Sequence, residues 1–278
     1  MSNRLVVEKW GAVPNFATVS ASLDYVEGMP EIKTYFGRFK NPIGIEVECE
    51  GLPNNPGRLK FWVVKEDGSL RNNGREFVSI PLSGRMIDYA LYELGATLAK
   101  QEKRSWSHRT SIHVHQNFST MREYHVMGYT MLYAVYEHLF YKMCAPFRRA
   151  NAFCYQAAGS LDPAAYVRIQ DTNKYCGLNL APLKRQCTVE FRQMHGTDDL
   201  TLLRRWLQLI VKLHAWVEAQ PSRKVVGIIT EHIEAQTFVQ LAKSIWGVNT
   251  TLFSDQFIQE GAVNNAVWAL CLSNMEYV

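Results

Sequence analysis

The sequence lacks the features that mark several large classes of protein. It has no long hydrophobic run, because the most apolar stretch, 127–141, is interrupted by Glu137 and His138 and is too short to cross a bilayer. Its six cysteines form no C-x-x-C pair, and no internal repeat or low-complexity tract is present. We therefore expect no membrane partner, and we interpret the cysteines as free thiols in a reducing cytoplasm.

The chain also lacks a large excess of charge of either sign. The chain carries 30 Lys and Arg against 26 Asp and Glu, a net charge of +4, without the dense basic run typical of proteins that coat nucleic acid. Nucleic-acid binding is therefore not indicated. With 47% hydrophobic and 20% charged residues the composition is globular, which excludes disordered, collagen-like and coiled-coil proteins. We expect one domain over residues 41–278 and treat residues 1–40 as an irregular extension packed on it.

The sequence does contain a series of strands that each have one polar face. In the segment 43–50, apolar residues alternate with glycine and carboxylates, which predicts a strand with one apolar and one acidic face. Residues 111–118 and 187–194 alternate in the same way, and Asp67-Gly68 is typical of a hairpin turn. We therefore expect antiparallel strands at 43–50, 59–65, 75–80, 111–118, 174–180 and 187–193.

Helical spacing of apolar residues accounts for most of the remaining chain. It predicts helices at 84–104, 121–143, 231–246 and 254–272, and a further helix that begins after Thr197-Asp198-Asp199. Because the segment 121–143 is apolar nearly all round, we expect that helix to be buried between other elements. The expected fold class is α+β, with helices packed on the apolar face of a curved antiparallel sheet.

The polar faces of four strands hold the residues that could carry chemistry. They are Glu46, Glu48, Glu76, His113, His115, Glu190 and Arg192. If these faces converge, the carboxylates would repel one another unless cations lay between them. A site dominated by oxygen ligands suits Mg²⁺ or Mn²⁺ better than zinc, and these ions favour phosphate oxygens. Divalent metals together with phosphates imply a nucleotide.

Six segments, taken in order, resemble one known family. They are GIEVECEG (44–51), DGSL (67–70), EFVSIPLSG (76–84), SIHVHQNF (111–118), KYCGLNL (174–180) and TVEFRQMHGTDD (188–199). Together they resemble the amidoligases of the glutamine synthetase-like fold, nearest to the carboxylate-amine ligases carried by many bacteria and bacteriophages, and more distantly the glutamate-cysteine ligases. The resemblance covers roughly residues 41–200 and departs from the family at Cys176 and Gly177.

This resemblance implies an ATP-dependent enzyme that joins a carboxylate to an amine through an acyl phosphate. It implies Mg²⁺ or Mn²⁺ ligands at Glu46, Glu48, Glu76, His113 and Glu190, and catalytic roles for Glu46, Glu76 and Arg192. It implies nucleotide contacts from His113, His115, Arg148, Arg149, Lys174, Asn179 and Arg192. The expected partners are ATP, the carboxylate and the amine, and assembly into a homo-oligomer is left undecided. The expected location is the cytoplasm, or the host cytoplasm for a phage protein.

Other interpretations of the same residues stay open at this level. Taken alone, Glu46 and Glu48 fit a solvated strand face, and Asp67 is explained as a turn former. The His-x-His pair also occurs in metal-dependent hydrolases, although those barrels alternate parallel strands with helices, whereas residues 46–80 read as an antiparallel meander. A third interpretation is a non-catalytic protein that retains the ligase fold.

Overall fold

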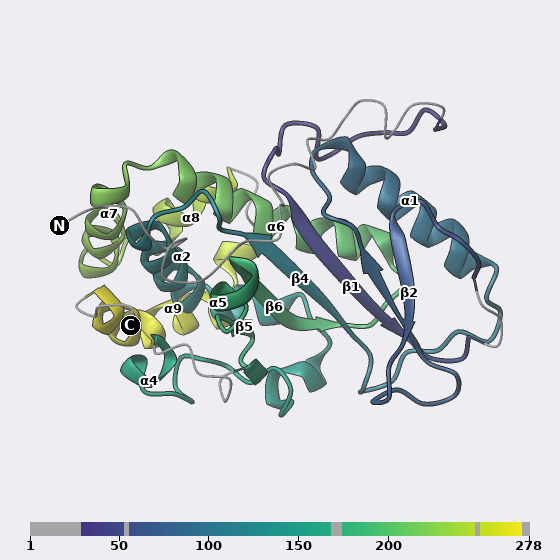
Figure 1. Cartoon of the computed structure of the whole chain (residues 1–278). Helices are drawn as coiled ribbons and strands as arrows, with labels where there is room; N and C mark the ends of the chain where they lie inside the picture. Colours follow the sequence, from purple (N-terminus) through teal and green to yellow (C-terminus); the bar gives the residue numbers. More distant parts are fainter. Residues whose placement is uncertain (1–28, 53–55, 168–173, 248–250, 274–278) are drawn as a thin grey trace.

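An open sheet of six antiparallel strands forms the centre of the computed structural model, which describes residues 29–52, 56–167, 174–247 and 251–273 (Figure 1). The strand order is β2-β3-β1-β4-β6-β5. The strands are β1 (Ile43–Cys49), β2 (Trp62–Glu66), β3 (Arg75–Ser79), β4 (Ser111–Asn117), β5 (Leu178–Asn179) and β6 (Thr188–His195). The expected α+β class and the antiparallel pairing are confirmed.

Strand β1 shows why the sheet has two unlike faces. Successive side chains of a strand point to opposite sides, so its β-branched and apolar residues form one face and its glutamates the other. The apolar set is fully buried and consists of Ile43, Ile45, Val47 and Cys49. Glu46 and Glu48 therefore lie on the opposite face, as the alternation predicted.

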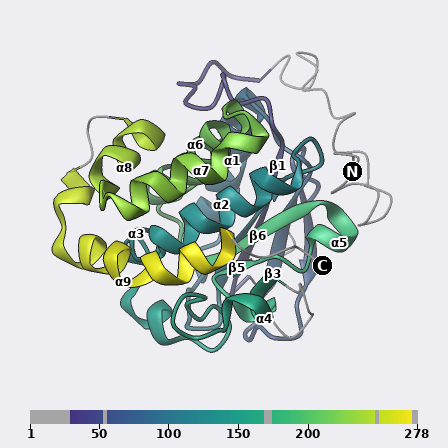
Figure 2. The ribbon, with the colours of Figure 1, turned by 90° about the vertical axis from the view of Figure 1, so that its left-hand side faces the viewer.

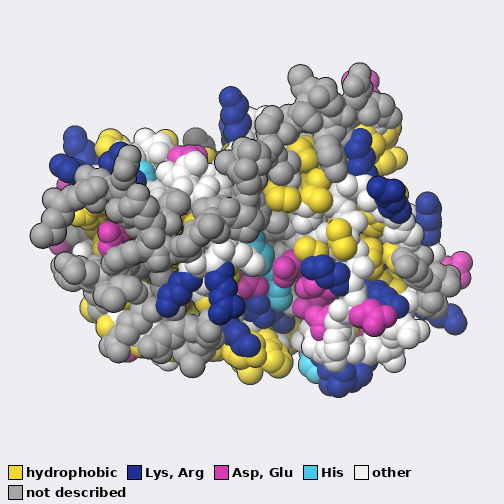
Figure 3. Space-filling view, viewed as in Figure 1, with side chains coloured by type: hydrophobic (Ala, Val, Ile, Leu, Met, Phe, Trp, Pro, Cys, Tyr) yellow, Lys and Arg dark blue, Asp and Glu magenta, His cyan; other side chains and the backbone are white. Residues whose placement is uncertain are grey.

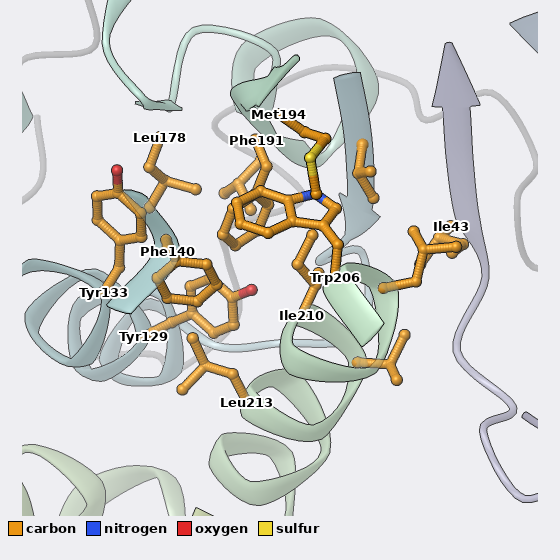
Figure 4. Packing of buried hydrophobic residues seen from close by; sticks show 14 of the residues in the cluster. Ile43, Tyr129, Tyr133, Phe140, Leu178, Phe191, Met194, Trp206, Ile210 and Leu213 are labelled. Carbon is orange, nitrogen blue, oxygen red and sulfur yellow. The ribbon is translucent and has the colours of Figure 1, made fainter. Parts of the chain in front are cut away.

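Helices α1 (Arg85–Ala99) and α6 (Leu200–Ala219) pack on the apolar face of the sheet, and rings of the helical segment 123–142 also contact Phe191 on this face. Helix α1 packs on β2, where the indole Nε1 of Trp62 donates to the carbonyl oxygen of Ala90 at 2.9 Å. Helix α6 packs on β6, and its Trp206 meets the Phe191 ring edge to face, at 6.2 Å between centroids (Figure 4). Fully burying one such aromatic side chain contributes about 1.5–3 kcal/mol, so these contacts anchor both helices.

The remaining long helices form a second layer beside the sheet. Helix α2 (Glu123–Val135) lies between α7 (Ser222–Glu234) and α9 (Gln256–Ser273) (Figure 2). Its residues from Val126 to Val135 are all buried, which confirms the expected buried helix. The other elements are α3 (Glu137–Lys142), α8 (Phe238–Trp246) and the short η2 (Pro146–Ala150), α4 (Pro163–Val167), α5 (Leu183–Gln186) and η4 (Thr251–Ser254).

Several expected boundaries are wrong, and tertiary hydrogen bonds explain two of them. Strand β2 begins at Trp62 instead of 59 because the backbone N–H groups of Lys60 and Phe61 donate to the Glu93 carboxylate at 2.8 and 2.9 Å. The expected helix 121–143 is interrupted at Tyr136, beside which the buried Glu137 carboxylate accepts from the N–H groups of Ala157 and Ala158.

The other differences are changes of length. Helix α1 ends at Ala99 instead of 104, and the strand expected at 174–180 is reduced to β5. The helix expected at 231–246 is two helices, α7 and α8, separated by a turn in which Gln236 has a positive φ of 53°.

The expected extension, residues 1–40, is described only from residue 29 onwards, and residues 1–28 lie outside the described part. In residues 29–40, Phe36 is fully buried, and the Tyr35 and Phe36 N–H groups donate to the Asp88 carboxylate at 2.9 and 3.1 Å. All six cysteines are free, as expected. In the described part of the chain, no helix has both the length and the apolar character to cross a membrane.

Candidate metal and nucleotide site

The strand register brings the predicted site residues together on the polar face of the sheet. Glu46 of β1 lies directly opposite His113 of β4, and His115 of β4 lies opposite Glu190 of β6. On the other side of β1, Glu48 pairs with Glu76 of β3. Figure 3 shows this face, with His, Asp and Glu side chains gathered at its centre and Lys and Arg side chains beside them.

One group of ligand atoms lies over β1, β4 and β6. Atoms of Glu46, His115 and Glu190 lie within 4.8 Å of one another. The Nδ1 atom of His113 lies 3.3 Å from Glu46 Oε2 and 3.3 Å from Glu190 Oε1. Two carboxylates and two imidazoles thus converge on one point from three neighbouring strands.

A second group lies over β1 and the β2–β3 hairpin. Ligand atoms of Glu48, Asp67 and Glu76 also lie within 4.8 Å of one another. Asp67 forms the expected turn, because its Oδ1 accepts from the Ser69 N–H at 2.7 Å. Its place in this group was missed by the sequence analysis, in which the Asp-Gly pair was fully explained by the turn.

Ser111 joins the two groups, and no motif singled it out. Its hydroxyl donates to Glu48 Oε2 at 2.7 Å, so the hydroxyl oxygen is left to accept from His113 Nε2 at 2.9 Å. When His113 is protonated, its Nδ1 donates to Glu46 Oε2 at 3.3 Å. When it is neutral and donates from Nε2 to Ser111, its lone pair lies on Nδ1, which faces Glu46 and Glu190. Such outer hydrogen bonds orient the histidine ligands of many metal sites.

Two further polar residues orient the first group from β5 and β6. Asn179 donates to Glu190 Oε2 at 2.6 Å, and the His115 Nδ1 lies 3.0 Å from the Thr188 hydroxyl. The Nε2 of His115 therefore points toward Glu46 Oε1, 3.6 Å away. Asn179 was a predicted nucleotide contact, and here it lies beside the carboxylate group.

The charges of the site shift the proton affinities of its members. Burial raises the pKa of Glu46, but hydrogen bonds with His113 and His115 outweigh burial and hold that pKa well below its ordinary value. Burial likewise lowers the pKa of His115, but the hydrogen bond to Glu46 and the charge of Glu190 raise it overall. Burial together with the charges of Glu46 and Glu48 raises the pKa of Glu76 to about 7.

The predicted basic residues are not all placed at the carboxylate groups. Arg192 lies there, because its Nη1 donates to Glu190 Oε1 at 2.5 Å and its Nε to the Phe153 carbonyl at 3.3 Å. Lys174 is exposed, and its Nζ lies 4.8 Å from the centroid of the Tyr175 ring.

Arg148 and Arg149, two predicted nucleotide contacts, lie elsewhere. Arg148 is only 2% exposed, and its Nε and Nη2 donate to the Gln193 and Arg192 carbonyl oxygens at 2.9 and 2.6 Å. The Arg149 guanidinium lies 4.4 Å from the centroid of the Phe257 ring. In the structure the Arg148 guanidinium binds the backbone of β6 and that of Arg149 packs on α9, so neither has a contact with the carboxylate groups that would support the predicted nucleotide contact.

The donor set of the site fits hard divalent cations. Each group offers carboxylate oxygens close enough to share one ion, and the first group adds imidazole nitrogens. Mg²⁺ or Mn²⁺ would neutralise the second group, where the charges of Glu46 and Glu48 raise the pKa of Glu76. No cysteine shares these groups, which also favours an oxygen-preferring ion.

Comparison with known proteins adds no family for this chain. No family model matches the sequence, and a search of the curated proteins finds no match. The function must therefore be argued from the site itself.

Proposed function

We propose that the protein is an ATP- and Mg²⁺-dependent carboxylate-amine ligase that forms an amide bond through an acyl phosphate. The observation that carries this proposal is the convergence of Glu46, His113 and Glu190 from three adjacent strands, beside a second carboxylate group. Two cation sites side by side are suited to a phosphate chain, since phosphoryl transfer requires positioning and charge neutralisation. The resemblance to the glutamine synthetase-like amidoligases supports the same conclusion.

The residues of the site have distinct roles in this proposal. When bound, the divalent cations would neutralise the phosphate oxygens and the charge that develops during transfer. Glu46, Glu190 and the two histidines would hold one ion, and Glu48 and Glu76 would hold the other, with Asp67 beside them. Arg192 presents a planar fork to the carboxylate or to the phosphoryl group being transferred. The Glu48–Ser111–His113 hydrogen bonds keep the imidazole aimed at the ion.

A metal-dependent hydrolase is the second candidate. The group of Glu46, His115 and Glu190 resembles the carboxylate and imidazole sets that bind transition metals in hydrolases. The sheet is antiparallel throughout its described strands, unlike the parallel barrels in which His-x-His pairs serve hydrolysis. A tightly bound transition metal after purification, together with ester or amide hydrolysis without ATP, would favour this candidate over the ligase.

The decisive experiment follows ADP and phosphate release from Mg-ATP with pooled carboxylates and amines. We expect release that depends on one carboxylate and amine pair, and a loss of at least about a thousandfold in Glu46→Gln and in Glu190→Gln, because each removes a charged ligand of the ion. Glu66→Gln is the matched control, since this strand glutamate is exposed and its carboxylate forms an ion pair with Arg75.

The outcome can contradict the proposal in two ways. Circular dichroism would first establish that each variant keeps its fold. A folded Glu46→Gln or Glu190→Gln variant with wild-type turnover would exclude the proposed ligands. Release of AMP and pyrophosphate in place of ADP and phosphate would exclude the acyl phosphate.

A further inference from the structure

Two aromatic side chains lie beside the candidate site without a role in metal or phosphate binding. Phe153 is 56% exposed, the second most exposed of the large hydrophobic residues described, and its ring meets Tyr175 edge to face at 5.6 Å between centroids. An exposed aromatic pair of this kind offers a surface on which the ring of a ligand can pack. The pair comes from two segments, before and after α4, that a parallel bridge between Tyr155 and Cys176 holds together.

Arg192 connects this aromatic pair to the metal-binding groups. Its Nε donates to the Phe153 carbonyl, and its Nη1 donates to Glu190. The Cζ atom of the same guanidinium lies 6.0 Å from the centroid of the Tyr175 ring. One arginine side chain therefore binds Glu190 on one side and, on the other, the backbone of Phe153 beside the Tyr175 ring.

We propose that Phe153 and Tyr175 bind an aromatic group of the carboxylate substrate, while Arg192 binds its carboxyl group. The inference rests on the proposed ligase function and names the substrate class as carboxylates with an aromatic ring a few bonds from the carboxyl carbon. Ligand sites commonly combine an apolar wall with a few fixed polar groups in this way. Two rings at right angles offer both a face and an edge to a bound ring.

The short spacing favours the carboxylate substrate over the base of ATP. A nucleobase is separated from its γ-phosphorus by the ribose and two further phosphates. The aromatic pair instead lies one guanidinium away from Glu190, which belongs to the group that would hold the ion at the transferred phosphoryl. A ring carried close to a reacting carboxyl group matches that spacing, and Lys174 beside Tyr175 adds a positive charge that suits an acid.

A matched pair of probes tests the inference by binding alone. The probes are 3-phenylpropanoate and butanoate, in which a methyl group replaces the phenyl ring, and their dissociation constants are measured by ligand-observed NMR with Mg²⁺ and a non-hydrolysable ATP analogue. We expect the wild type to prefer the phenyl probe by about tenfold or more, the effect of roughly 1.4 kcal/mol that one aromatic contact supplies.

Variants then locate the preference on the surface. Phe153→Ala and Tyr175→Ala should each reduce the ratio of the two dissociation constants to about threefold or less, because each removes one wall of the ring site. Phe147→Ala is the matched control: this phenylalanine is 46% exposed on η2, and its loss should leave the wild-type ratio unchanged.

Each result either supports or overturns the inference. A wild type without preference for the phenyl probe, or variants that keep the full preference, would overturn it. Variants that weaken binding of the ATP analogue relative to tripolyphosphate, with the carboxylate ratio unchanged, would assign the surface to the nucleobase and overturn it as well. Preference for the phenyl probe without any ADP release would instead contradict the ligase and leave the aromatic surface as the binding site for the acid.

Discussion

At the scale of single residues, His214 is a buried imidazole that folding keeps neutral. It is 1% exposed on α6, its Nε2 lies 2.9 Å from the Asn117 carbonyl oxygen, and the ring of Phe118 meets it edge to face. The carboxylate of Glu218 is 3.9 Å from the Nδ1 atom of His214, and the charge of His125 disfavours protonation of His214. Burial dominates these effects and lowers the pKa of His214 to about 3.

This lowered pKa makes the stability of the protein depend on acid in a predictable direction. The unfolded chain binds a proton at this site near pH 6.5, and the folded protein only near pH 3. The stabilising contribution is therefore complete above pH 6.5 and is lost as the pH falls from 6.5 toward 3, by up to about 1.4 kcal/mol per pH unit.

Denaturant unfolding between pH 6 and pH 4 measures this loss. In His214→Gln, whose amide can still donate to Asn117, the free energy of unfolding should fall less steeply with acid, by about 1.4 kcal/mol per unit relative to wild type. Equal slopes for the two proteins would show that His214 carries no such linkage.

At the scale of elements, α6 depends on a single capping carboxylate. Asp199 Oδ1 accepts from the backbone N–H groups of Thr201 and Leu202 at 2.9 and 3.0 Å, which satisfies donors that the first helical turn leaves unpaired. The negative charge of Asp199 also interacts favourably with the positive end of the helix dipole. Because α6 covers the apolar face of β6, the cap also supports the strand that carries Glu190 and Arg192.

Removal of this cap should destabilise the protein without changing its chemistry. Asp199→Ala is expected to lower the free energy of unfolding by about 1 kcal/mol, as for other N-caps, while Asp199→Asn should lose only a few tenths because the amide oxygen still accepts. Chemical denaturation of both variants checks this order. If Asp199→Asn lost as much free energy of unfolding as Asp199→Ala, the charge of Asp199, and not its hydrogen bonds, would stabilise the helix start.

At the scale of the whole molecule, the clustered carboxylates couple metal binding to stability. Three strands and the β2–β3 hairpin contribute ligands, so an ion bound there links elements that are distant in the sequence. A ligand that binds only the folded state stabilises it, by about 2.7 kcal/mol at a concentration of one hundred times Kd. For a chain of this size that corresponds to a rise in Tm of roughly 5 °C or more.

Thermal unfolding with Mg²⁺ or Mn²⁺, and after chelation, tests this coupling. The wild type should show the rise and lose it with chelator. Glu190→Gln should have a much smaller rise, because one ligand of the first group is neutral, whereas the exposed control Glu66→Gln should respond like the wild type. An equal rise in Glu190→Gln would place the bound ion elsewhere.

Local patterns in the chain accounted for much of this architecture. The alternation predicted the strands β1, β4 and β6 and the polar side chains Glu46, His113 and Glu190, because successive side chains of a regular strand point to opposite sides. The alternation expected through residue 194 is wrong at Met194, which a bulge in β6 turns into the core. The start of α6 followed from its short acidic residues in the same local way. Helix α7 was missed before residue 231, since its β-branched residues and Gly227 weaken the helical signal that packing on α2 overrides.

The sequence by itself determined the polar faces of β1 and β4, because these depend only on the period of the strand. In β6 a bulge between Phe191 and Met194 breaks the period and places Met194 in the apolar core (Figure 4). Only the tertiary structure decided which polar residues meet, since partners such as His115 and Glu190 are set by strand register, including the irregularity between Ile112 and Val114. The same is true of Asp67, Ser111 and Phe153, whose contacts span distant segments. Long-range contacts likewise decide where Arg148 and Arg149 lie, because the β6 backbone and α9 hold their guanidinium groups.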